Sequence, residues 1–348
     1  MKATTGMLVG LGTLATLAVS CTLERTLAGP GAPAFDESAT SAAPVVLHVV
    51  APQATDPAID KALDNHYVWL DTTARSNHEL LVLMPGTGGL PVRFQLLDQE
   101  AARLGYHVIG LMYPNGVDLS TCGSAPDPAS CYENARLEIL DGVDRSSIVD
   151  VNAANSIENR LTKLLQLLAA QYPDEGWSRF LAHDTPKWSR IAVGGFSQGG
   201  GEAAMIGKLR LVARVVMFSA PTDSIRTEAP PWLATRVTPS DRYWGLAHDR
   251  DLLYRPIRAG WDSLGMASFG PAVALETSTP PYGFTHMLIT DLLPQSGSFR
   301  QIDVHRSTAN DLLTPLNADG TPILRDAWRY LLTARAADGD DNVEVDEP

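Results

Sequence analysis

A serine flanked by glycines is the strongest chemical signal in the sequence, at Gly195-Phe196-Ser197-Gln198-Gly199. The apolar run "RIAVGG" leads into it, and the helix-forming run "EAAMIGKL" follows. A G-x-S-x-G sequence between a strand and a helix holds the serine hydroxyl on a strained turn at the edge of a sheet. The two outer glycines let neighbouring backbone pass without a side-chain clash. The pattern predicts that Ser197 is a nucleophile. The alternative is a glycine-rich turn in which Ser197 only caps the helix.

A second glycine-rich segment, "LMPGTGG" (83–89), follows an earlier apolar run. Attack of a serine on an acyl group places negative charge on the carbonyl oxygen, and backbone N–H groups can stabilise that charge. We expect the amide of Gln198, directly after the nucleophile, and the amide of Thr87 to form this oxyanion hole. The alternatives are a simple strand-to-helix turn or a phosphate-binding loop, although no lysine and serine follow as a P-loop requires.

With these two motifs in this order, the chain resembles the α/β-hydrolase fold over about residues 45–334. It is similar to the exported serine esterases and cutinase-like polyester hydrolases of that superfamily. The resemblance implies a mostly parallel central sheet with helices on both faces. It also implies a catalytic triad in the chain order Ser, Asp, His and the hydrolysis of small or polymeric carboxylic esters through an acyl-enzyme, without a cofactor.

The acid of such a triad is expected after the second strand beyond the serine. Asp251, in "YWGLAHDRDLLY" (243–254), stands just past that run and is our candidate. Asp223, Asp249 and Glu276 remain alternatives, and a solvated loop carboxylate is the ordinary role of any of them.

The base is expected after the last strand of the sheet. We interpret "AVALET" (272–277) as that strand, which makes His286 the base in the Pro/Gly-containing segment that follows. His286 would then lie within hydrogen-bond distance of both Ser197 and Asp251 and would take the serine proton. His305, after "RQIDV", is the alternative if that alternating run is the last strand instead.

The elements that must position these residues follow from the apolar pattern. Short apolar runs alternate with helical patterns from residue 45 onward, which is typical of an α/β protein. Strands are expected at 45–50, 66–71, 79–85, 106–113, 189–196, 213–219, 242–248 and 272–277, and helices at 91–105, 155–172, 198–210 and 322–334. Asn155 is the expected N-cap of its helix, and residues 114–150 are expected to form a long loop.

Residues 219–241 are the segment in which a cap would be inserted, and they are too few for a large cap domain. We therefore expect an open cleft, with Trp232 or Tyr282 as candidate walls of an acyl pocket. Cys122 and Cys131 flank a Pro/Gly/Ser-rich segment and are expected to form a disulfide, the alternative being two free thiols.

Composition limits the partners. The 348 residues carry a net charge of −13, which argues against nucleic acid, because binding phosphates needs clustered Lys and Arg. Apolar residues make up 45% of the chain, enough for a substantial core. The cysteines and histidines lack zinc-ligand spacing, so we expect no metal. We expect a monomer.

The N-terminus has the pattern of a targeting segment. We interpret residues 1–28 as an export signal, because the apolar run at 6–19 is short and Gly-rich for a membrane span. Cys21 after Ser20 resembles a bacterial lipoprotein signal, and a lipidated Cys21 would be the only membrane attachment. The alternative is an ordinary secretory signal. Residues 29–44 have linker composition, and 335–348 form an acidic tail expected to be disordered.

Two other functions fit the same sequence. A lipoprotein could keep the fold and bind a ligand at a cleft without catalysis. An acyltransferase could use the same triad and pass the acyl group to an alcohol.

Overall fold

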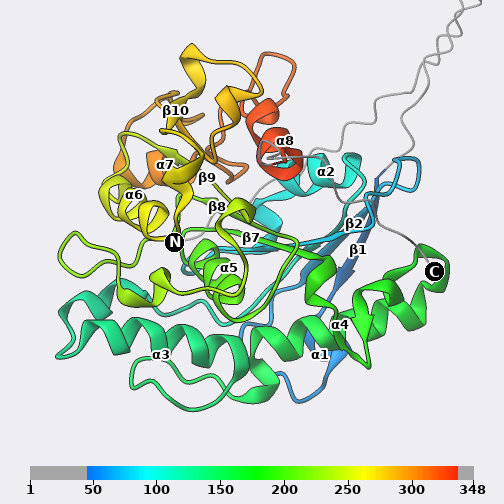
Figure 1. Ribbon diagram of the computed structural model, residues 1–348. Helices are drawn as coiled ribbons and strands as arrows, with labels where there is room; N and C mark the ends of the chain where they lie inside the picture. Colours follow the sequence, from blue (N-terminus) through cyan, green and yellow to red (C-terminus); the bar gives the residue numbers. More distant parts are fainter. Residues whose placement is uncertain (1–44, 336–348) are drawn as a thin grey trace, which may run out of the picture. The chain divides into compact units, whose positions relative to one another are not determined.

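A nine-stranded sheet forms the centre of the protein, and helices flank it on both faces (Figure 1). The structure is a computed structural model, and it describes residues 45–335. The strand order is β1-β2-β4-β3-β7-β8-β9-β11-β10. β2 runs antiparallel to both of its neighbours, and all the other neighbouring strands are parallel. The expected α/β class with a mostly parallel sheet is therefore confirmed.

The strands of this sheet are β1 (Val46–Val50), β2 (His66–Leu70), β3 (Leu80–Met84), β4 (His107–Gly110), β7 (Ile191–Phe196), β8 (Arg214–Phe218), β9 (Tyr243–His248), β10 (Val273–Ala274) and β11 (Met287–Thr290). The helices are α1 (Pro52–Thr55), α2 (Gln95–Arg103), α3 (Pro128–Asp141), α4 (Ile157–Gln171), α5 (Gln198–Leu209), α6 (Tyr254–Ser263), α7 (Gln301–Arg306) and α8 (Arg325–Thr333). A separate two-stranded ribbon pairs β5 (Leu181–Ala182) with β6 (Thr185–Pro186).

The sheet divides the hydrophobic core into two layers. Successive side chains of a strand point to opposite faces. Leu80 and Val82 of β3 accordingly pack in the layer that includes α4 and α5, whereas Leu81 and Leu83 pack in the layer that includes α2 and α8. All five residues of β3 are buried, as the continuous apolar run predicted for a strand covered on both faces.

Two expectations about the segment before β7 are wrong. Residues 114–150 are not a loop throughout, because they contain the 3₁₀ helix η2 (Leu119–Ser124) and the fourteen-residue helix α3. Asp127 caps α3 by accepting a hydrogen bond from the amide of Ser130. The N-cap of α4 is Ser156, which accepts from the amide of Asn159, and not Asn155. Asn155 is buried and instead accepts from the amide of Lys61.

The end of the sheet also differs from the expectation. "AVALET" contributes only the two residues of β10, after which the chain turns into a short 3₁₀ helix. The unexpected strand β11 follows at 287–290 and lies between β9 and β10. "RQIDV" is not a strand, because it lies in α7.

The export segment, Cys21, the linker and all but the first residue of the acidic tail lie outside the described residues. Within residues 45–335, no helix is long and apolar enough to cross a membrane.

Candidate active site

Ser197 lies on the turn that joins β7 to α5, as the motif predicted. Its backbone has φ 53° and ψ −118°, a conformation that costs about 1–3 kcal/mol for a residue with a side chain. Gly195 and Gly199 lack side chains for the expected reason, which is that neighbouring backbone passes too close. A Cβ atom on Gly195 would lie 2.3 Å from the carbonyl carbon of Gly199, and one on Gly199 would lie 2.1 Å from the carbonyl oxygen of Met84.

The two following glycines are equally confined. A Cβ atom on Gly200 would lie 2.4 Å from the Cβ of Ala220, which follows β8. One on Gly201 would lie 2.3 Å from a guanidinium nitrogen of Arg136 in α3. The first turn of α5 therefore packs directly against three segments that are distant in the sequence.

The structure brings Ser197, His305 and Asp251 together in one hydrogen-bonded chain. The Oγ of Ser197 lies 2.9 Å from Nε2 of His305, and Nδ1 of His305 lies 2.6 Å from Oδ2 of Asp251. An ionised carboxylate only accepts hydrogen bonds, so Nδ1 carries the proton and donates to Asp251. Nε2 of the neutral ring is then free to accept the serine proton.

The elements that hold Asp251 and His305 are short. Asp251 is the third residue after β9, and its Oδ1 accepts from the amide of Leu253 at 2.9 Å. Its side chain is only 1% exposed, compared with 11% for His305. His305 lies in α7, where its backbone carbonyl accepts a hydrogen bond of 2.8 Å from the hydroxyl of Ser219. The base is thereby attached to the end of β8.

The structure does not bring His286 to Ser197, so that expectation is wrong. His286 directly precedes β11, whereas Ser197 and Asp251 follow the ends of their strands. Because these strands are parallel, His286 lies at the opposite end of the strands from Ser197 and Asp251. Its Nδ1 bonds to the carbonyl of Tyr243 at 2.9 Å, and its ring is stacked on Trp244 with the centroids 3.7 Å apart. Burial lowers the pKa of His286 to about 4.

The alternative acids contact other groups. Asp223 accepts two hydrogen bonds from Arg136, and Glu276 accepts one from the hydroxyl of Thr290. The side chain of Asp249 is 42% exposed. None of the three is hydrogen-bonded to His305 within the described residues, so Asp251 is the carboxylate that the structure places beside the base.

The two expected oxyanion residues lie beside the serine. Thr87 and Gln198 line the same cavity of about 240 Å³ as Ser197 and His305. The hydroxyl of Thr87 donates to Oε1 of Gln198 at 2.7 Å, which joins the glycine-rich loop to the start of α5. Among the described residues, the amides of Thr87 and Gln198 have no acceptor. Both are therefore available to a ligand.

Asn115 fixes the glycine-rich loop, a role that the sequence analysis missed. Its side-chain amide donates to the carbonyl of Gly86 at 2.8 Å and to that of Gly89 at 2.9 Å. Its backbone carbonyl accepts from the amide of Gly88 at 2.9 Å. Asn115 thus forms hydrogen bonds to both ends of the loop and preorganises the amide of Thr87, which lies between them.

Arg136 fixes the other side of the site and was also missed. Its guanidinium is fully buried and donates to both carboxylate oxygens of Asp223, to Glu202 at 2.9 Å and to the carbonyl of Gln198 at 3.2 Å. Gln198, the residue after the serine, is therefore held in place by a network of buried charged side chains. Burial raises the pKa of Glu202 to about 8, although Arg136 opposes the shift.

This pKa predicts that Glu202 makes stability depend on pH. An ordinary glutamate has a pKa of 4.5 and ionises in the unfolded chain, whereas folded Glu202 holds its proton up to about pH 8. The native state thus loses up to about 1.4 kcal/mol per pH unit as the pH rises from 4.5 towards 8. We expect Glu202→Gln to match the wild type in thermal unfolding at pH 4.5 and to have the higher Tm at pH 8. Equal shifts of Tm with pH in both proteins would contradict this.

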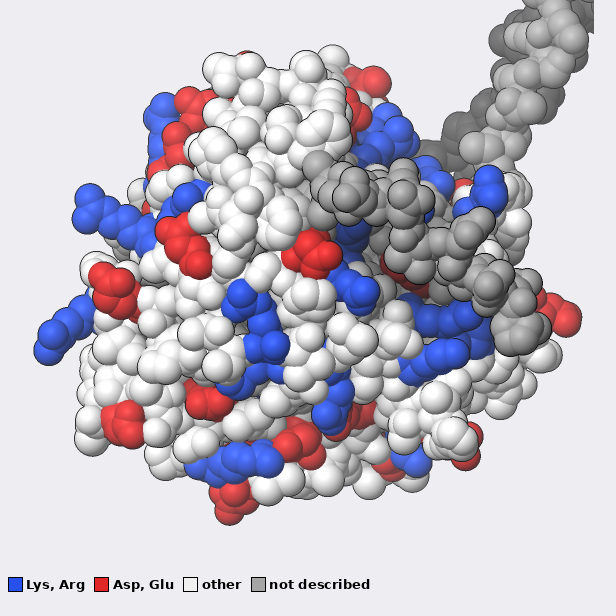
Figure 2. Space-filling model, viewed as in Figure 1, with Lys and Arg blue, Asp and Glu red and all other residues white. Residues whose placement is uncertain are grey.

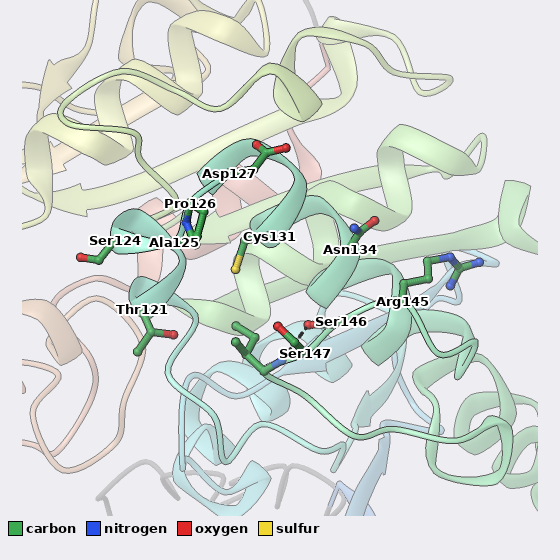
Figure 3. A pocket seen from close by; sticks show the side chains of 11 residues that line it. Thr121, Ser124, Ala125, Pro126, Asp127, Cys131, Asn134, Arg145, Ser146 and Ser147 are labelled. Carbon is green, nitrogen blue, oxygen red and sulfur yellow. Dashed lines mark hydrogen bonds between the residues drawn. The ribbon is translucent and has the colours of Figure 1, made fainter.

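The expected disulfide between Cys122 and Cys131 is confirmed, with an S–S distance of 2.03 Å. It joins η2 to α3, the helix in which Figure 3 labels Cys131, and Leu119 and Ser120 of η2 line the cavity beside Ser197. Cys131 also borders a cavity of about 430 Å³ that shares no lining residue with the serine cavity. Arg145 at that second cavity is already paired with Asp141, 2.6 Å away.

Removing the disulfide with the double variant Cys122→Ser/Cys131→Ser is expected to lower the free energy of unfolding by about 2–3 kcal/mol, because the unfolded chain regains loop entropy. Denaturant unfolding with and without reductant measures this. The reduced wild type should behave like the double variant. An oxidised wild type no more stable than the reduced one would contradict the prediction.

The two aromatic candidates for an acyl pocket do not line the serine cavity. Trp232 is buried and donates its indole N–H to Asp223 at 3.1 Å. Tyr282 packs edge-on against Tyr330, with the centroids 5.1 Å apart, and borders a different cavity.

In the described part of the chain, no three His, Cys, Asp or Glu side chains are grouped so that they could hold a metal ion. Comparison with known proteins finds neither a matching family nor a matching curated protein.

Proposed function

We propose that the protein is a serine hydrolase that cleaves carboxylic esters with Ser197, His305 and Asp251. The observation that carries this proposal is the continuous hydrogen-bonded chain from Asp251 through His305 to a serine on a strained strand-to-helix turn. A serine that only capped a helix would not need a histidine and a buried carboxylate in line behind it.

In the first step, the Ser197 hydroxyl attacks the ester carbonyl carbon while Nε2 of His305 takes its proton. Asp251 stabilises the resulting imidazolium through Nδ1. The amides of Thr87 and Gln198 donate to the oxyanion of the tetrahedral intermediate. The intermediate then collapses, the carbon–oxygen bond to the alcohol breaks, and His305 returns the proton to the departing alcohol. The acyl group remains on Ser197.

In the second step, water attacks the acyl-enzyme and gives its proton to Nε2 of His305. Collapse of the second tetrahedral intermediate breaks the bond between the acyl carbon and the serine oxygen. The proton returns to Ser197, the carboxylic acid leaves, and the site is restored. Every proton in this cycle passes through one ring nitrogen, and the chemistry requires no cofactor.

The α/β-hydrolase fold is part of this proposal. It is supported by the position of Ser197 after a central parallel strand, by the glycine-rich loop after β3 and by the triad order Ser, Asp, His. The segment between β8 and β9 spans 219–242 and holds only short 3₁₀ helices, which supports an open cleft without a large cap. The confirmed disulfide agrees with export to an oxidising compartment, which we also propose.

A labelled organophosphonate tests the proposal directly, because it reacts only with an activated serine. We expect stoichiometric labelling of the wild type at Ser197 and none of the Ser197→Ala variant. A folded wild type that resists the label would favour the alternative of a non-catalytic binding protein. Product analysis with added alcohol separates hydrolysis from acyl transfer, since an acyltransferase would form a new ester in place of the acid.

A further inference from the structure

A third cavity, of about 280 Å³, adjoins the serine cavity, because Thr87 lines both. Its lining residues are Gly86, Thr87, Gly88, Gly89, Leu90, Arg93, Phe94, Phe196, Arg306, Asn310, Leu312 and Leu313. The oxyanion loop, residues 86–89, therefore lines this cavity together with the apolar side chains of phenylalanines and leucines.

Two arginines border this cavity from separate segments. Arg93 ends the 3₁₀ helix η1 (Pro91–Arg93), and Arg306 ends α7 directly after the proposed base. The amide of Asp311 donates to the carbonyl of Arg93 at 2.8 Å, and the amide of Asn310 donates to that of Arg306 at 3.0 Å. The first of these hydrogen bonds joins the two segments, so the backbones that carry both arginines border one cavity.

Neither guanidinium forms an ion pair or a hydrogen bond with any residue in the range 45–335, and no acidic side chain lines the cavity. Two carboxyl groups interact electrostatically with these arginines, Asp311 with Arg93 and Asp303 with Arg306, but both form their hydrogen bonds with other groups. Asp311 accepts from the amides at the start of α2, and burial raises its pKa to about 7. Asp303, below Arg306 in α7, is paired with Arg300 at 2.8 Å.

The chain as a whole is acidic, which makes this local charge unusual. The net charge is −13, and on the face drawn in Figure 2 acidic and basic side chains are interspersed. The serine cavity has the opposite character, because it is lined by Asp118 and its one arginine, Arg136, is paired with the buried carboxylate of Asp223. The two sides of the oxyanion loop therefore differ in charge.

We propose that Arg93 and Arg306 bind an anionic group, and that the preferred substrates are carboxylic esters that carry such a group at the end of a short apolar chain. The anion would lie between the two guanidinium groups, and the apolar chain would pack against Phe94 and Phe196. This inference rests on the proposed ester hydrolysis at Ser197. It adds a substrate class and an orientation of the ester in the cleft.

Two esters that differ in this charge and by one methyl group test the inference, with the rate of each without enzyme subtracted, because the free carboxylate can attack its own ester. 4-Nitrophenyl hydrogen glutarate carries a free carboxylate, and 4-nitrophenyl methyl glutarate carries a methyl ester in its place. Both release the same 4-nitrophenolate. We expect a kcat/KM that is about three- to tenfold higher for the anionic ester, mainly through a lower KM, because exposed charge-assisted contacts are worth roughly 1 kcal/mol. The preference should fall with added salt, which screens exposed charges.

The variants Arg93→Gln and Arg306→Gln should each reduce the ratio of the two kcat/KM values, and the double variant should bring it to about one. Arg75→Gln is the matched control. Arg75 is also exposed and precedes β3 at the opposite edge of the sheet, and its loss changes the net charge by the same amount. It should leave the ratio unchanged, which separates local binding from attraction by the whole protein.

A ratio near one in the wild type, or a double variant that keeps the wild-type ratio, would overturn the inference while ester hydrolysis stands. If neither ester is turned over, the proposed function fails, and binding still tests the cavity. Calorimetry with Ser197→Ala should then show tighter binding of the anionic ester than of the methyl ester. Equal affinities would overturn the inference by this second measurement.

Discussion

Ser197→Ala is expected to abolish hydrolysis of a short 4-nitrophenyl ester and to leave the fold intact. The change removes one oxygen atom, the one that lies 2.9 Å from Nε2 of His305. Without it, no acyl-enzyme forms, and we expect kcat to fall by roughly 10⁴-fold or more, as it does when a triad nucleophile is removed. The strained backbone at this position remains, so Tm should change by only a few degrees, in keeping with the loss of one hydrogen bond.

The measurement is a progress curve of 4-nitrophenolate release with circular dichroism and thermal unfolding of the same sample. Thr87→Ser serves as a comparison, since it keeps both the backbone amide and the hydroxyl of the oxyanion loop and should retain most of the activity. Residual activity of Ser197→Ala within tenfold of the wild type, in a protein that is correctly folded, would rule out this serine as the nucleophile.

His305→Ala is expected to lose activity and keep its stability, whereas His286→Ala is expected to lose stability. Removing His305 takes away the group that accepts the serine proton, and kcat should drop by roughly 10³-fold or more with little loss of stability. Removing His286 leaves a cavity between Trp244 and Phe269. The ring centroids of these residues lie 3.7 Å and 3.9 Å from that of His286. That loss should cost about 2–4 kcal/mol of unfolding free energy, as for other large buried side chains.

Both variants are measured for ester turnover per folded molecule and for denaturant unfolding. His286→Gln provides a finer control, because it keeps a polar group near the carbonyl of Tyr243 and should recover part of the lost stability. A folded His286→Ala protein that has lost its turnover, together with an active His305→Ala protein, would contradict the triad described above.

The positions of Ser197 and Asp251 in the proposed site could be predicted from the sequence because each depends on a local pattern. Ser197 is marked by glycines whose missing side chains are required by close backbone contacts. Asp251 follows β9, a six-residue buried strand, so counting strands from the serine reaches it correctly. Between Ser197 and Asp251, the sequence pattern and the sheet agree.

The base could not be placed in the same way, because the last strands are short. β10 has two residues although "AVALE" is the stronger apolar run, and β11 has four residues within a segment without alternation. Which apolar run becomes the strand next to β9 is determined by contacts with β9, which is distant in the sequence. α7 has only six residues, too few for helical periodicity to separate it from the alternating pattern of a strand.

Helix α3 was missed for a different physical reason. Its buried face includes Arg136 and Glu138, so the apolar stripe that marks a helix is interrupted. Both charges are buried because they have partners elsewhere. Arg136 contacts Asp223 and Glu202, and Glu138 accepts hydrogen bonds from the amides of residues 145, 146 and 151. A pattern of single residues cannot show such pairings.

The glycines of the first turn of α5 have a consequence for mutational scanning of this protein. Any side chain at Gly199, Gly200 or Gly201 would collide with the carbonyl of Met84, with Ala220 or with Arg136, respectively. Substitutions there should reduce the yield of soluble protein before they affect chemistry. In a screen that records only total activity, these positions would look as essential as the nucleophile. Normalising activity to the amount of folded protein would separate Ser197, which we propose is needed for turnover, from the glycines, which are needed for assembly of the turn.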